Sequence, residues 1–238
     1  MPFTYEYRRP SVTVDCVVFG FDGDRHMQVL LIRRGEPPFK GKLALPGGFV
    51  DVSDEGDQGE SLEDAARREL AEETGVKLAY LEQLYTFGAP KRDPRGRVID
   101  VSYFALVRSE EHEAHAGSDA AAAKWVNVQD ALKQKLAFDH QEILAMANKR
   151  LQAKVRYAPI GFNLLPDEFT IADIRGLYEA ILGRELEPGN FHRRVMATDL
   201  LEPTGEVRSG GKHRPAALFR FDRKAYDRAM RDGFNFEI

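Results

Sequence analysis

The sequence has a single cysteine, Cys16, among its 238 residues. One cysteine excludes an internal disulfide framework, and such low cysteine usage is typical of a protein from a reducing compartment. The chain also has no run of about 18 apolar residues, which excludes a membrane-spanning helix. Its first residues lack the apolar core of a secretory signal. We therefore expect a soluble, cytoplasmic protein that has no membrane partner.

The sequence also lacks an excess of positive charge, because 34 basic residues stand against 38 acidic ones and the net charge is −4. A surface for nucleic acid would therefore have to be confined to one part of the chain. The proportions of hydrophobic residues, 43%, and of charged residues, 30%, are ordinary for a globular protein. A chain of this length folds as one large domain or as two smaller ones.

Short runs rich in β-branched and aromatic residues dominate the first part of the chain and predict β-strands. These runs lie at 12–21, 27–32, 43–50, 78–87, 98–107 and 123–128. Two helices are expected among them. The first begins at Ser61, whose spacing to Asp64 is that of a capping box, and ends at Gly75. The second covers 139–155 and has an apolar stripe. This part is therefore a mixed α and β domain in which strands outnumber helices.

The pattern changes after an irregular connector, and the second part predicts a helix, a turn, a helix, a hairpin and a last helix. The helices are predicted at 169–182, 190–199 and 222–231, and the strands at 206–208 and 214–221. Thr170 is placed to cap the first of these helices, and Pro188-Gly189 to form the turn. This element order is that of a winged helix-turn-helix. We therefore divide the chain into the domains 1–155 and 156–238.

Three glutamates lie on one side of the predicted helix that begins at Ser61. Glu69, Glu72 and Glu73 stand at i, i+3 and i+4, so they fill an arc of about 100° beside the apolar stripe. Carboxylates crowded at the edge of a core repel one another and lose hydration unless a cation compensates them. Mg²⁺ and Mn²⁺ prefer such oxygen ligands. The spacing therefore favours a metal site, with Arg68 placed to orient one carboxylate, and a solvated or salt-bridged face is the alternative.

The same segment resembles the Nudix box. Glu60 is followed by seven residues and then by Arg68-Glu69-Leu70-Ala71-Glu72-Glu73-Thr74-Gly75-Val76. Together they match every fixed position of the box from its first glutamate onward. Upstream, eleven residues separate Gly48 from Glu60 where the box has five, and Asp54 occupies the position of the strict glycine. We interpret this departure as an inserted loop, because Pro46-Gly47-Gly48-Phe49-Val50 matches the usual approach to the box.

The resemblance to the Nudix family implies an α+β fold, in which a mixed sheet is sandwiched between helices. It also implies Mg²⁺-dependent (or Mn²⁺-dependent) cleavage of a nucleoside diphosphate linked to another group. The catalytic motif would consist of Arg68, Glu69, Glu72 and Glu73, with the glutamates holding the metal and the carbonyl of Gly48 as a further ligand. Such ions neutralise the diphosphate and activate a water. The general base stays open between Glu69 and the loop carboxylates at 110–119.

Basic residues flank the glycine-rich segment and fill a later, turn-rich loop. Arg33 and Arg34 precede the glycines, and Arg92 and Arg95 lie in the loop at 88–97. Arginines in such places pair with phosphate or ribose groups, and solvated loop charges are the alternative. The proline and the Arg-Asp-Pro-Arg sequence of this loop are similar to Nudix members associated with ADP-ribose, which implies that ligand. Candidates to stack on its adenine, or else core residues, are Phe87, Tyr103 and Phe104.

The second helix and the hairpin of the C-terminal part are locally basic. Eight basic residues stand against four acidic ones between residues 190 and 224. Positive charge supplies most of the non-specific affinity for DNA, and arginine and asparagine suit guanine and adenine edges. The charge pattern equally fits a solvated basic helix in an accessory or dimerisation domain. The candidate DNA contacts are Asn190, Arg193 and Arg194 on the helix and Lys212, His213 and Arg214 at the wing.

The C-terminal part is also similar to the Nudix-related transcriptional regulators of the NrtR type. The similarity is carried by Asn163-Leu164-Leu165-Pro166, by Gly189-Asn190-Phe191-His192-Arg193-Arg194 and by Gly210-Gly211-Lys212-His213-Arg214-Pro215. It implies a homodimeric repressor of NAD-metabolism or sugar-utilisation genes that binds a double-stranded DNA operator and responds to ADP-ribose or a related nucleotide. Hydrolysis of the ligand stays open because the glutamates of the box are intact. The alternative is an ADP-ribose pyrophosphatase, giving AMP and ribose 5-phosphate, whose C-terminal domain does not bind DNA.

Overall fold

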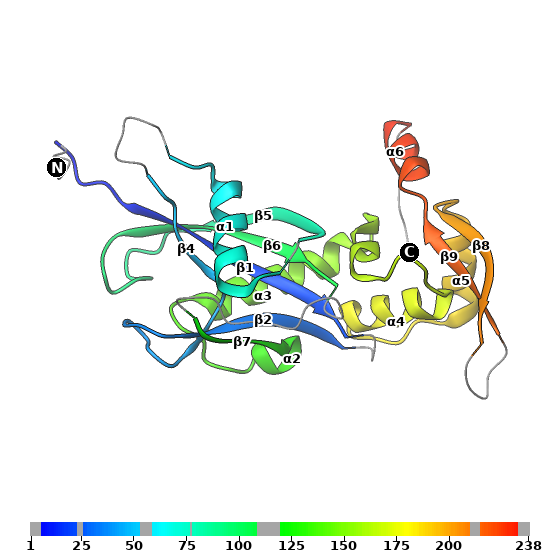
Figure 1. Ribbon diagram of the computed structural model, residues 1–238, viewed down its shortest axis with the longest axis horizontal. Helices are drawn as coiled ribbons and strands as arrows, with labels where there is room; N and C mark the ends of the chain where they lie inside the picture. The colour runs from blue at the N-terminus through cyan, green and yellow to red at the C-terminus, as the bar shows by residue number, and fades with distance from the viewer. Residues whose placement is uncertain are drawn as a thin grey trace. The chain divides into compact units, whose positions relative to one another are not determined.

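The computed structural model describes residues 6–22, 26–52, 59–76, 78–108, 120–209 and 215–232. The chain divides into two compact units (Figure 1). Most of the first unit lies before residue 148, and the second unit consists mainly of residues 148–238. Helix α3 (His140–Lys154) runs across this division, and the boundary predicted after residue 155 falls just beyond its end. In the described part of the chain, no helix is long and apolar enough to cross a membrane.

A mixed seven-stranded sheet forms the first unit. Its strands are β1 (Ser11–Phe21), β2 (Met27–Arg34), β3 (Leu43–Ala44), β4 (Gly47–Phe49), β5 (Tyr80–Phe87), β6 (Val98–Leu106) and β7 (Ala120–Asn127). Five of them follow the order β3, β2, β1, β6, β5, while β4 also pairs with β1 and β7 with β2. The pair β1–β6 is parallel, and the pairs β1–β4, β2–β3, β2–β7 and β5–β6 are antiparallel.

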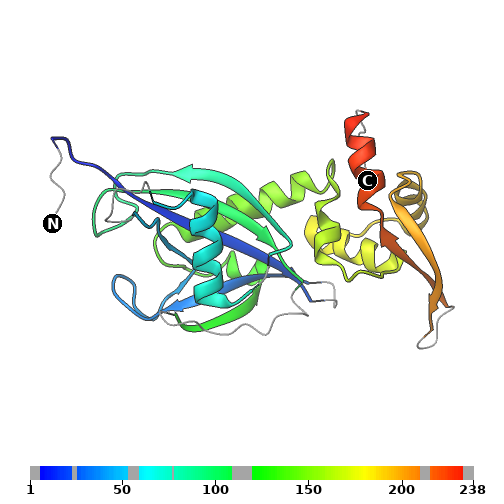
Figure 2. The same ribbon diagram turned by 45° about the horizontal axis from the view of Figure 1, so that its top comes forward.

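The core of the first unit lies on β1 and β6. Every residue of β1 from Thr13 onward is buried, as is almost all of β6, which suits central strands of a sheet covered on both faces. Helix α1 (Leu62–Thr74) packs on one face through Ala65, Ala66 and Leu70, which share a core cluster with Val14 of β1. Figures 1 and 2 show α3 on the opposite face. The sheet thus lies between helices, and the predicted sandwich is confirmed.

One predicted strand is divided in two. The run at 43–50 forms β3 and β4, which pair with different neighbours. Pro46, between them, has no N–H for a ladder hydrogen bond, and its carbonyl accepts from the N–H of Cys16 at 2.8 Å. A further difference follows β7, where the short helix α2 (Val128–Ala131) begins after Asn127, whose side chain caps it. The sequence pattern does not predict this helix.

The second unit consists of helices followed by a hairpin. Its elements are the 3₁₀ helix η2 (Pro159–Leu164), α4 (Ile171–Leu182), α5 (Pro188–Met196), β8 (Leu201–Arg208), β9 (Ala216–Phe221) and α6 (Arg223–Arg231). β8 and β9 are antiparallel, and Phe169 adds a bridge to Phe219. Tyr178 of α4 packs against Phe191 of α5 with ring centroids 5.6 Å apart. This order confirms the predicted winged helix, although β8 begins at Leu201 rather than at residue 206.

Capping residues set the starts of α4 and α5. Thr170 caps α4 as predicted: its Oγ1 accepts from the N–H of Asp173, and Asp173 Oδ2 accepts from the N–H of Thr170. The prediction for α5 is wrong at its start, because Pro188-Gly189 is the first turn of the helix. The carboxylate of Glu187 accepts backbone N–H groups of that turn. Proline is favoured at the first helical position, where no N–H is needed.

Candidate functional site

Helix α1 presents its glutamates at the edge of the sheet. The Oγ of Ser61 accepts an N–H of the first turn, and Gly75 ends the helix with a positive φ of 68°, both as predicted. The buried residues of α1 form a stripe that faces the sheet. Glu69 and Glu73 lie next to this stripe on the helix and are half-buried. Glu72 is exposed. Two of the three glutamates are therefore held against the protein, and the third faces solvent.

The glycine-rich strand β4 runs directly against these two carboxylates. The N–H of Gly47 donates to Glu73 Oε2 at 2.8 Å. A Cβ atom at Gly48 would lie only 2.2 Å from Glu69 Oε1, far inside van der Waals contact. Gly48 is therefore a position where the absence of a side chain lets the strand approach the helix, and its backbone lies at the carboxylate of Glu69.

Arg68 gathers the acidic groups around it. Its guanidinium donates to Glu60 at 2.7 Å, to Glu69 at 2.9 Å, to Glu72 at 3.2 Å and to the carbonyl of Phe49 at 3.1 Å. The hydrogen bonds from Arg68 lower the pKa of Glu60, and those to Glu60 raise the pKa of Arg68. Glu60 thus contacts Arg68 of the box, even though the segment that we interpret as an inserted loop comes just before Glu60 in the sequence. Residues 53–58, with Asp54, lie outside the described part.

The electrostatics of the two half-buried glutamates favour a cation. Burial raises the pKa of Glu73 to about 8, and it also raises the pKa of Glu69. A carboxylate whose charge is disfavoured in this way is stabilised by a nearby positive ion. The described residues contain no group of three acidic, histidine or cysteine side chains already gathered around one point. The all-oxygen donor set and the close approach of Gly48 to Glu69 nevertheless fit Mg²⁺ or Mn²⁺.

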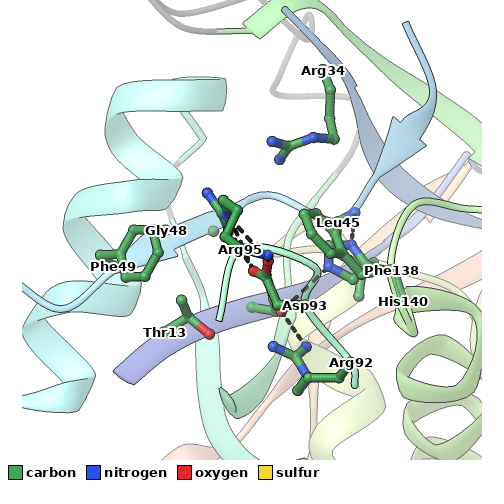
Figure 3. Close-up of a pocket in the computed structure, with 12 residues that line it drawn as sticks. Thr13, Arg34, Leu45, Gly48, Phe49, Arg92, Asp93, Arg95, Phe138 and His140 are labelled. Atoms are coloured by element: carbon green, nitrogen blue, oxygen red, sulfur yellow. Dashed lines mark hydrogen bonds and ion pairs between the residues drawn. The ribbon is translucent and has the colours of Figure 1, made fainter. Parts of the chain in front are cut away.

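A pocket of about 90 Å³ opens beside β4 (Figure 3). Its lining combines three arginines with three rings: Arg34, Arg92 and Arg95, and Phe49, Phe138 and His140. The lining also includes Gly47 and Gly48, which contact the carboxylates of α1. A ligand in this pocket therefore lies next to the glutamates.

Arg95 lies between two aromatic rings of the pocket. Its guanidinium carbon is 4.9 Å from the ring centroid of Phe49 and 5.6 Å from that of Phe138. The guanidinium of Arg34 lies 4.9 Å from the Phe138 ring. The side chain of Asp93, which is 2% exposed, orients Arg95 by accepting from its Nε, its Nη2 and its backbone N–H. Oriented cations beside aromatic faces suit a ligand that carries both phosphates and a planar ring.

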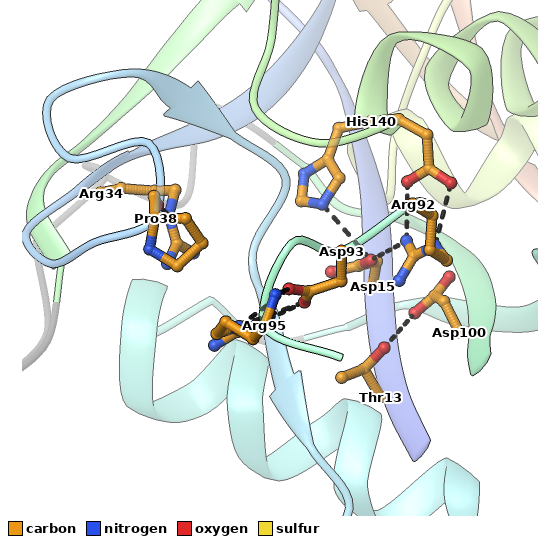
Figure 4. Close-up of polar contacts among 10 residues, drawn as sticks. Thr13, Asp15, Arg34, Pro38, Arg92, Asp93, Arg95, Asp100 and His140 are labelled. Atoms are coloured by element: carbon orange, nitrogen blue, oxygen red, sulfur yellow. Dashed lines mark hydrogen bonds and ion pairs between the residues drawn. The ribbon is translucent and has the colours of Figure 1, made fainter. Parts of the chain in front are cut away.

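Arg92 lies deeper and is engaged with carboxylates (Figure 4). Its side chain is 3% exposed, and it donates to Asp139 at 2.7 and 2.9 Å and to Asp15 at 3.3 Å. Beside it, Nδ1 of His140 accepts from the N–H of Leu45 at 2.9 Å. Burial lowers the pKa of His140 to about 4, so this ring is neutral near pH 7. Arg92 thus joins the β5–β6 loop to β1 and to the start of α3.

A second buried carboxyl, Asp100 on β6, faces Asp15 on β1. Asp100 Oδ1 accepts from Thr13 Oγ1 at 3.1 Å, and Oδ2 accepts from the hydroxyl of Ser102. Burial raises the pKa of Asp100 to about 8 and also raises that of Asp15. Burial and the negative charge of Asp15 thus both favour the protonated form of Asp100.

The structure places three of the four predicted ligand arginines at the pocket, namely Arg34, Arg92 and Arg95. Arg33 does not line it: this side chain is exposed, and its Nη1 donates to the carbonyl of Gly41 at 2.6 Å. The alternation of side chains along β2 separates the two neighbouring arginines. The loop carboxylates at 110–119 that are candidates for the general base lie outside the described residues.

The aromatic residues of the pocket differ from the predicted ones. Tyr103 and Phe104 are buried in the core of the first unit, and Phe87 packs on Tyr85 with ring centroids 5.6 Å apart. The pocket is walled instead by the two phenylalanines beside Arg95. The first directly follows the paired glycines, a position that could have identified it. The second, Phe138, has a positive φ of 49° that no local pattern announces.

Helix α5 exposes the predicted DNA-contact residues. Asn190, Arg193 and Arg194 are exposed, while Phe191 and Val195 are buried against the second unit. Nη2 of Arg193 donates to Asn190 Oδ1 at 2.7 Å, so these two side chains are already linked. The predicted wing residues Lys212, His213 and Arg214 lie outside the described part of the chain.

Two arginines of the hairpin are held by acidic residues at the start of α4. Nη1 of Arg208 donates to Asp173 Oδ2 at 2.8 Å, and Arg220 pairs with Glu168. The same Oδ2 atom of Asp173 also caps α4. These pairs anchor the hairpin on α4 and partly neutralise the positive charge counted there in the sequence.

The carboxylate helix packed against a glycine-rich strand defines the first unit as a Nudix-type domain, and the second unit is a winged helix. Residues 9–147 match the NUDIX domain, and residues 161–221 match the NrtR DNA-binding winged helix domain. The chain belongs to the Nudix family, in the group that carries an NrtR-type winged helix.

Known proteins are similar to this chain over one or both units. The ADPR responsive transcriptional repressor NtrR of Acinetobacter baylyi is 40% identical over 231 residues, covering 97% of this chain and 87% of that protein. Shewanella oneidensis NrtR, solved with a 27mer DNA, has a TM-score of 0.77 and 35% identity over 94% of this chain and 97% of that chain. The NUDIX domain of the same Shewanella protein, solved with ADP ribose, has a TM-score of 0.51 and 37% identity over 61% of this chain and 90% of that chain.

Proposed function

We propose that this protein is a transcriptional repressor that binds a double-stranded DNA operator with its winged helix and ADP-ribose, or a related nucleoside diphosphate, with its Nudix unit. One observation carries the proposal: an arginine-lined pocket beside half-buried glutamates occurs in one chain with a helix that exposes Asn190, Arg193 and Arg194. Similarity to an ADPR responsive repressor over 97% of the chain supports it. We expect a cytoplasmic protein that controls genes of NAD metabolism or sugar utilisation.

The ligand's diphosphate is expected at Arg34 and Arg95, whose guanidinium groups line the pocket and can form paired hydrogen bonds with phosphate oxygens. Phe49 and Phe138 offer the faces on which a base stacks. Arg92 has another role in this proposal. Because its donors are engaged with the buried carboxylate of Asp15 and the half-buried one of Asp139, it supports the pocket and does not need to touch the ligand.

Mg²⁺ or Mn²⁺ is the expected cofactor. Glu69, Glu72, Glu73 and the carbonyl of Gly48 would hold it, while Arg68 keeps two of the glutamates in place. The metal supplies charge neutralisation of the diphosphate and an activated water when it is bound. The protein itself contributes a fixed arrangement, because β4 holds the glutamates of α1 at the rim of the pocket.

A second function, hydrolysis of ADP-ribose to AMP and ribose 5-phosphate, is favoured by the complete set of box glutamates. The test incubates the purified full-length protein with ADP-ribose and Mg²⁺ and quantifies both products, with Glu73→Gln as the control. Turnover that is lost in Glu73→Gln makes the protein a hydrolase. Binding of ADP-ribose without turnover makes the carboxylate helix part of a sensor.

DNA binding has its own test. We expect a homodimer that places two winged helices on a two-fold operator, with α5 and the wing residues Lys212, His213 and Arg214 in contact with DNA. Replacing Arg193 and Arg194 together by Ala should abolish retention of a duplex that the wild type selects from a random library, while ADP-ribose binding persists. Saturating ADP-ribose should change the Kd for this duplex, because an effector acts through different affinities for two states. An unchanged Kd contradicts the proposal.

A further inference from the structure

Helix α6 follows the wing strand β9 and lies beyond residues 161–221, which match the winged helix domain. The family match therefore says nothing about the role of α6. The helix carries four basic residues, Arg223, Lys224, Arg228 and Arg231, against one acidic residue, Asp227. Its nine residues are thus strongly positive, although the whole chain has a net charge of −4.

Three of these basic residues form a stripe along one side of the helix. Lys224, Arg228 and Arg231 stand at i, i+4 and i+7, which places them within an arc of about 60°. All three side chains are exposed. The opposite side carries Tyr226, whose ring packs 5.9 Å from that of Phe221. The side of α6 opposite the stripe therefore contacts the end of β9 through Tyr226 and is half-buried, and the basic stripe faces solvent.

The stripe has no acidic partner among the residues that the structure describes. No ion pair joins any of its three members to a carboxylate there, and Arg231 donates only to the backbone carbonyl of Asp227, at 3.2 Å. The wing arginines Arg208 and Arg220, in contrast, are paired with acidic residues near α4. Within residues 6–232 as the structure describes them, the charge of the stripe is therefore not neutralised by an ion pair and is exposed to an external anion.

Helix α6 is fixed at the point where the hairpin meets α5. The N–H of Asp222 donates to the carbonyl of Leu200 at 2.8 Å, and Asp222 Oδ1 accepts from the N–H of Ala225 at 2.8 Å. Phe221, just before, stacks on Phe162 with ring centroids 4.5 Å apart. Because Leu200 connects α5 to β8, the stripe and the exposed arginines of α5 belong to one continuous body.

We propose that the stripe of Lys224, Arg228 and Arg231 binds the phosphate backbone of double-stranded DNA beside the segment that α5 contacts. The inference rests on the proposed function, because α5 must bring a duplex to this unit. Seven residues of helix rise about 10 Å, the axial length of about three base pairs, so the stripe meets successive phosphates. A membrane surface would require a broad apolar side, and the side of α6 opposite the stripe carries one tyrosine, one methionine and two alanines. Contacts to phosphates add affinity without reading sequence.

The test compares the salt dependence of DNA binding by full-length variants. The probes are a duplex that the wild type selects from a random library and the unselected library itself. In the variant Lys224→Gln/Arg228→Gln/Arg231→Gln, we expect the slope of log Kd against log salt to become shallower by about 0.9 per lost phosphate contact, or ~2.7 in total. Affinity should fall at least about tenfold on both probes, while the ratio of their Kd values stays unchanged.

Three further variants keep the result specific. Lys149→Gln/Arg156→Gln/Arg184→Gln removes the same charge from exposed positions outside α5, the wing and α6, and should leave the slope unchanged. The variant Lys224→Arg/Arg228→Lys/Arg231→Lys keeps the charge of the stripe and should keep the wild-type slope. Asp227→Asn removes the acidic residue beside the stripe and should tighten DNA binding. The inference is then tested by a gain of affinity as well as by a loss. Thermal unfolding checks that each variant is folded.

The outcomes separate this inference from the proposed function. A wild-type slope in the triple Gln variant, with the wild type binding DNA, overturns the inference and leaves the proposed function standing. A change in the Kd ratio at constant slope would assign the stripe to sequence reading, and a change in sedimentation at constant slope would assign it to contacts between copies of the chain. Both results overturn the inference. If the wild type binds no duplex, the proposed function fails and the inference fails with it.

Discussion

The guanidinium of Arg92 is fixed to the carboxylate of Asp139 by two hydrogen bonds, of 2.9 Å from Nε and 2.7 Å from Nη2. The loop of Arg92 also carries Arg95, and the turn of Asp139 also carries Phe138. The pair therefore sets the distance between a cation and a ring that line the pocket. We therefore expect the affinity for a ligand to depend on the contact between Arg92 and Asp139, although the ligand need not touch it.

Arg92→Lys tests this dependence. Lysine keeps the positive charge but lacks the planar fork that makes both hydrogen bonds. We expect the free energy of unfolding to fall by about 1.5–3 kcal/mol, the range for a lost hydrogen bond to a charged group, and ADP-ribose to bind more weakly. Urea unfolding and calorimetric titration measure the two effects. Arg97→Lys, in the same loop but exposed, is the matched control. Wild-type ligand affinity in Arg92→Lys would show that the pocket keeps its shape without this contact.

Arg95→Ala removes the cation that lies over two aromatic rings. A hydrogen bond to a charged group contributes about 1.5–3 kcal/mol, so the affinity for ADP-ribose should fall about 10- to 100-fold. Arg33→Ala removes the same charge from a side chain that does not line the pocket, and it should change the affinity less than about twofold. Titration calorimetry of both variants provides the comparison. Equal losses would mean that general charge, and not the pocket, attracts the ligand.

Gly48→Ala tests the contact between β4 and the carboxylate helix. The added methyl group would lie 2.2 Å from Glu69 Oε1, so the carboxylate or the strand must move. We expect Mn²⁺ binding, followed by electron paramagnetic resonance, to weaken at least about tenfold, the lower end of what a disturbed metal site loses. Gly96→Ala is the control, because a Cβ there meets nothing within 4 Å. If both variants bind Mn²⁺ like the wild type, the glutamates beside Gly48 do not hold the metal.

The buried carboxyl of Asp100 predicts a pH dependence of stability. Burial raises its pKa from 3.8 to about 8. The folded protein therefore keeps a proton that the unfolded chain releases, and the free energy of unfolding decreases as the pH rises toward 8. The Asp100→Asn variant has an uncharged side chain at every pH, so its stability relative to the wild type should increase across this range.

The measurement is urea unfolding between pH 6.5 and 8. This window avoids the opposite contribution of His140, whose lowered pKa makes the protein more stable as the pH rises from about 4 to 6.5. Asp130→Asn, at an exposed position, serves as the control. A constant difference between Asp100→Asn and the wild type would mean that Asp100 does not take up its proton on folding.

The carboxylate helix could be predicted residue by residue because its determinants are local. Ser61 and Gly75 set its ends through their own backbone and side-chain properties, and the spacing of Glu69 and Glu73 places both on one side. Such information lies within a few residues of each position. The start of α5 cannot be predicted in this way, because Pro188-Gly189 suits a turn as well as the first turn of a helix that Glu187 caps.

The pocket could be predicted only in part, because its geometry depends on tertiary contacts. Arg92 and Arg95 lie in one loop and are equivalent by residue type, but the first is buried among carboxylates and the second lies against aromatic rings. Asp15 and Phe138 are far from the glutamates in the sequence. Only the pairing of β1 with β4, and the packing of the turn before α3, bring them to the same pocket.

The Oδ2 atom of Asp173 accepts two hydrogen bonds, one from the N–H of Thr170 at the start of α4 and one from Arg208 in the hairpin. One oxygen is thus shared by a helix terminus and a wing. Fraying of the first turn of α4 therefore weakens the contact of Arg208 as well, while the Arg220–Glu168 pair and the bridge between Phe169 and Phe219 continue to hold the hairpin. The start of α4 and the wing are thus energetically coupled through one carboxylate, and a change at either place alters the hydrogen bonding of the other.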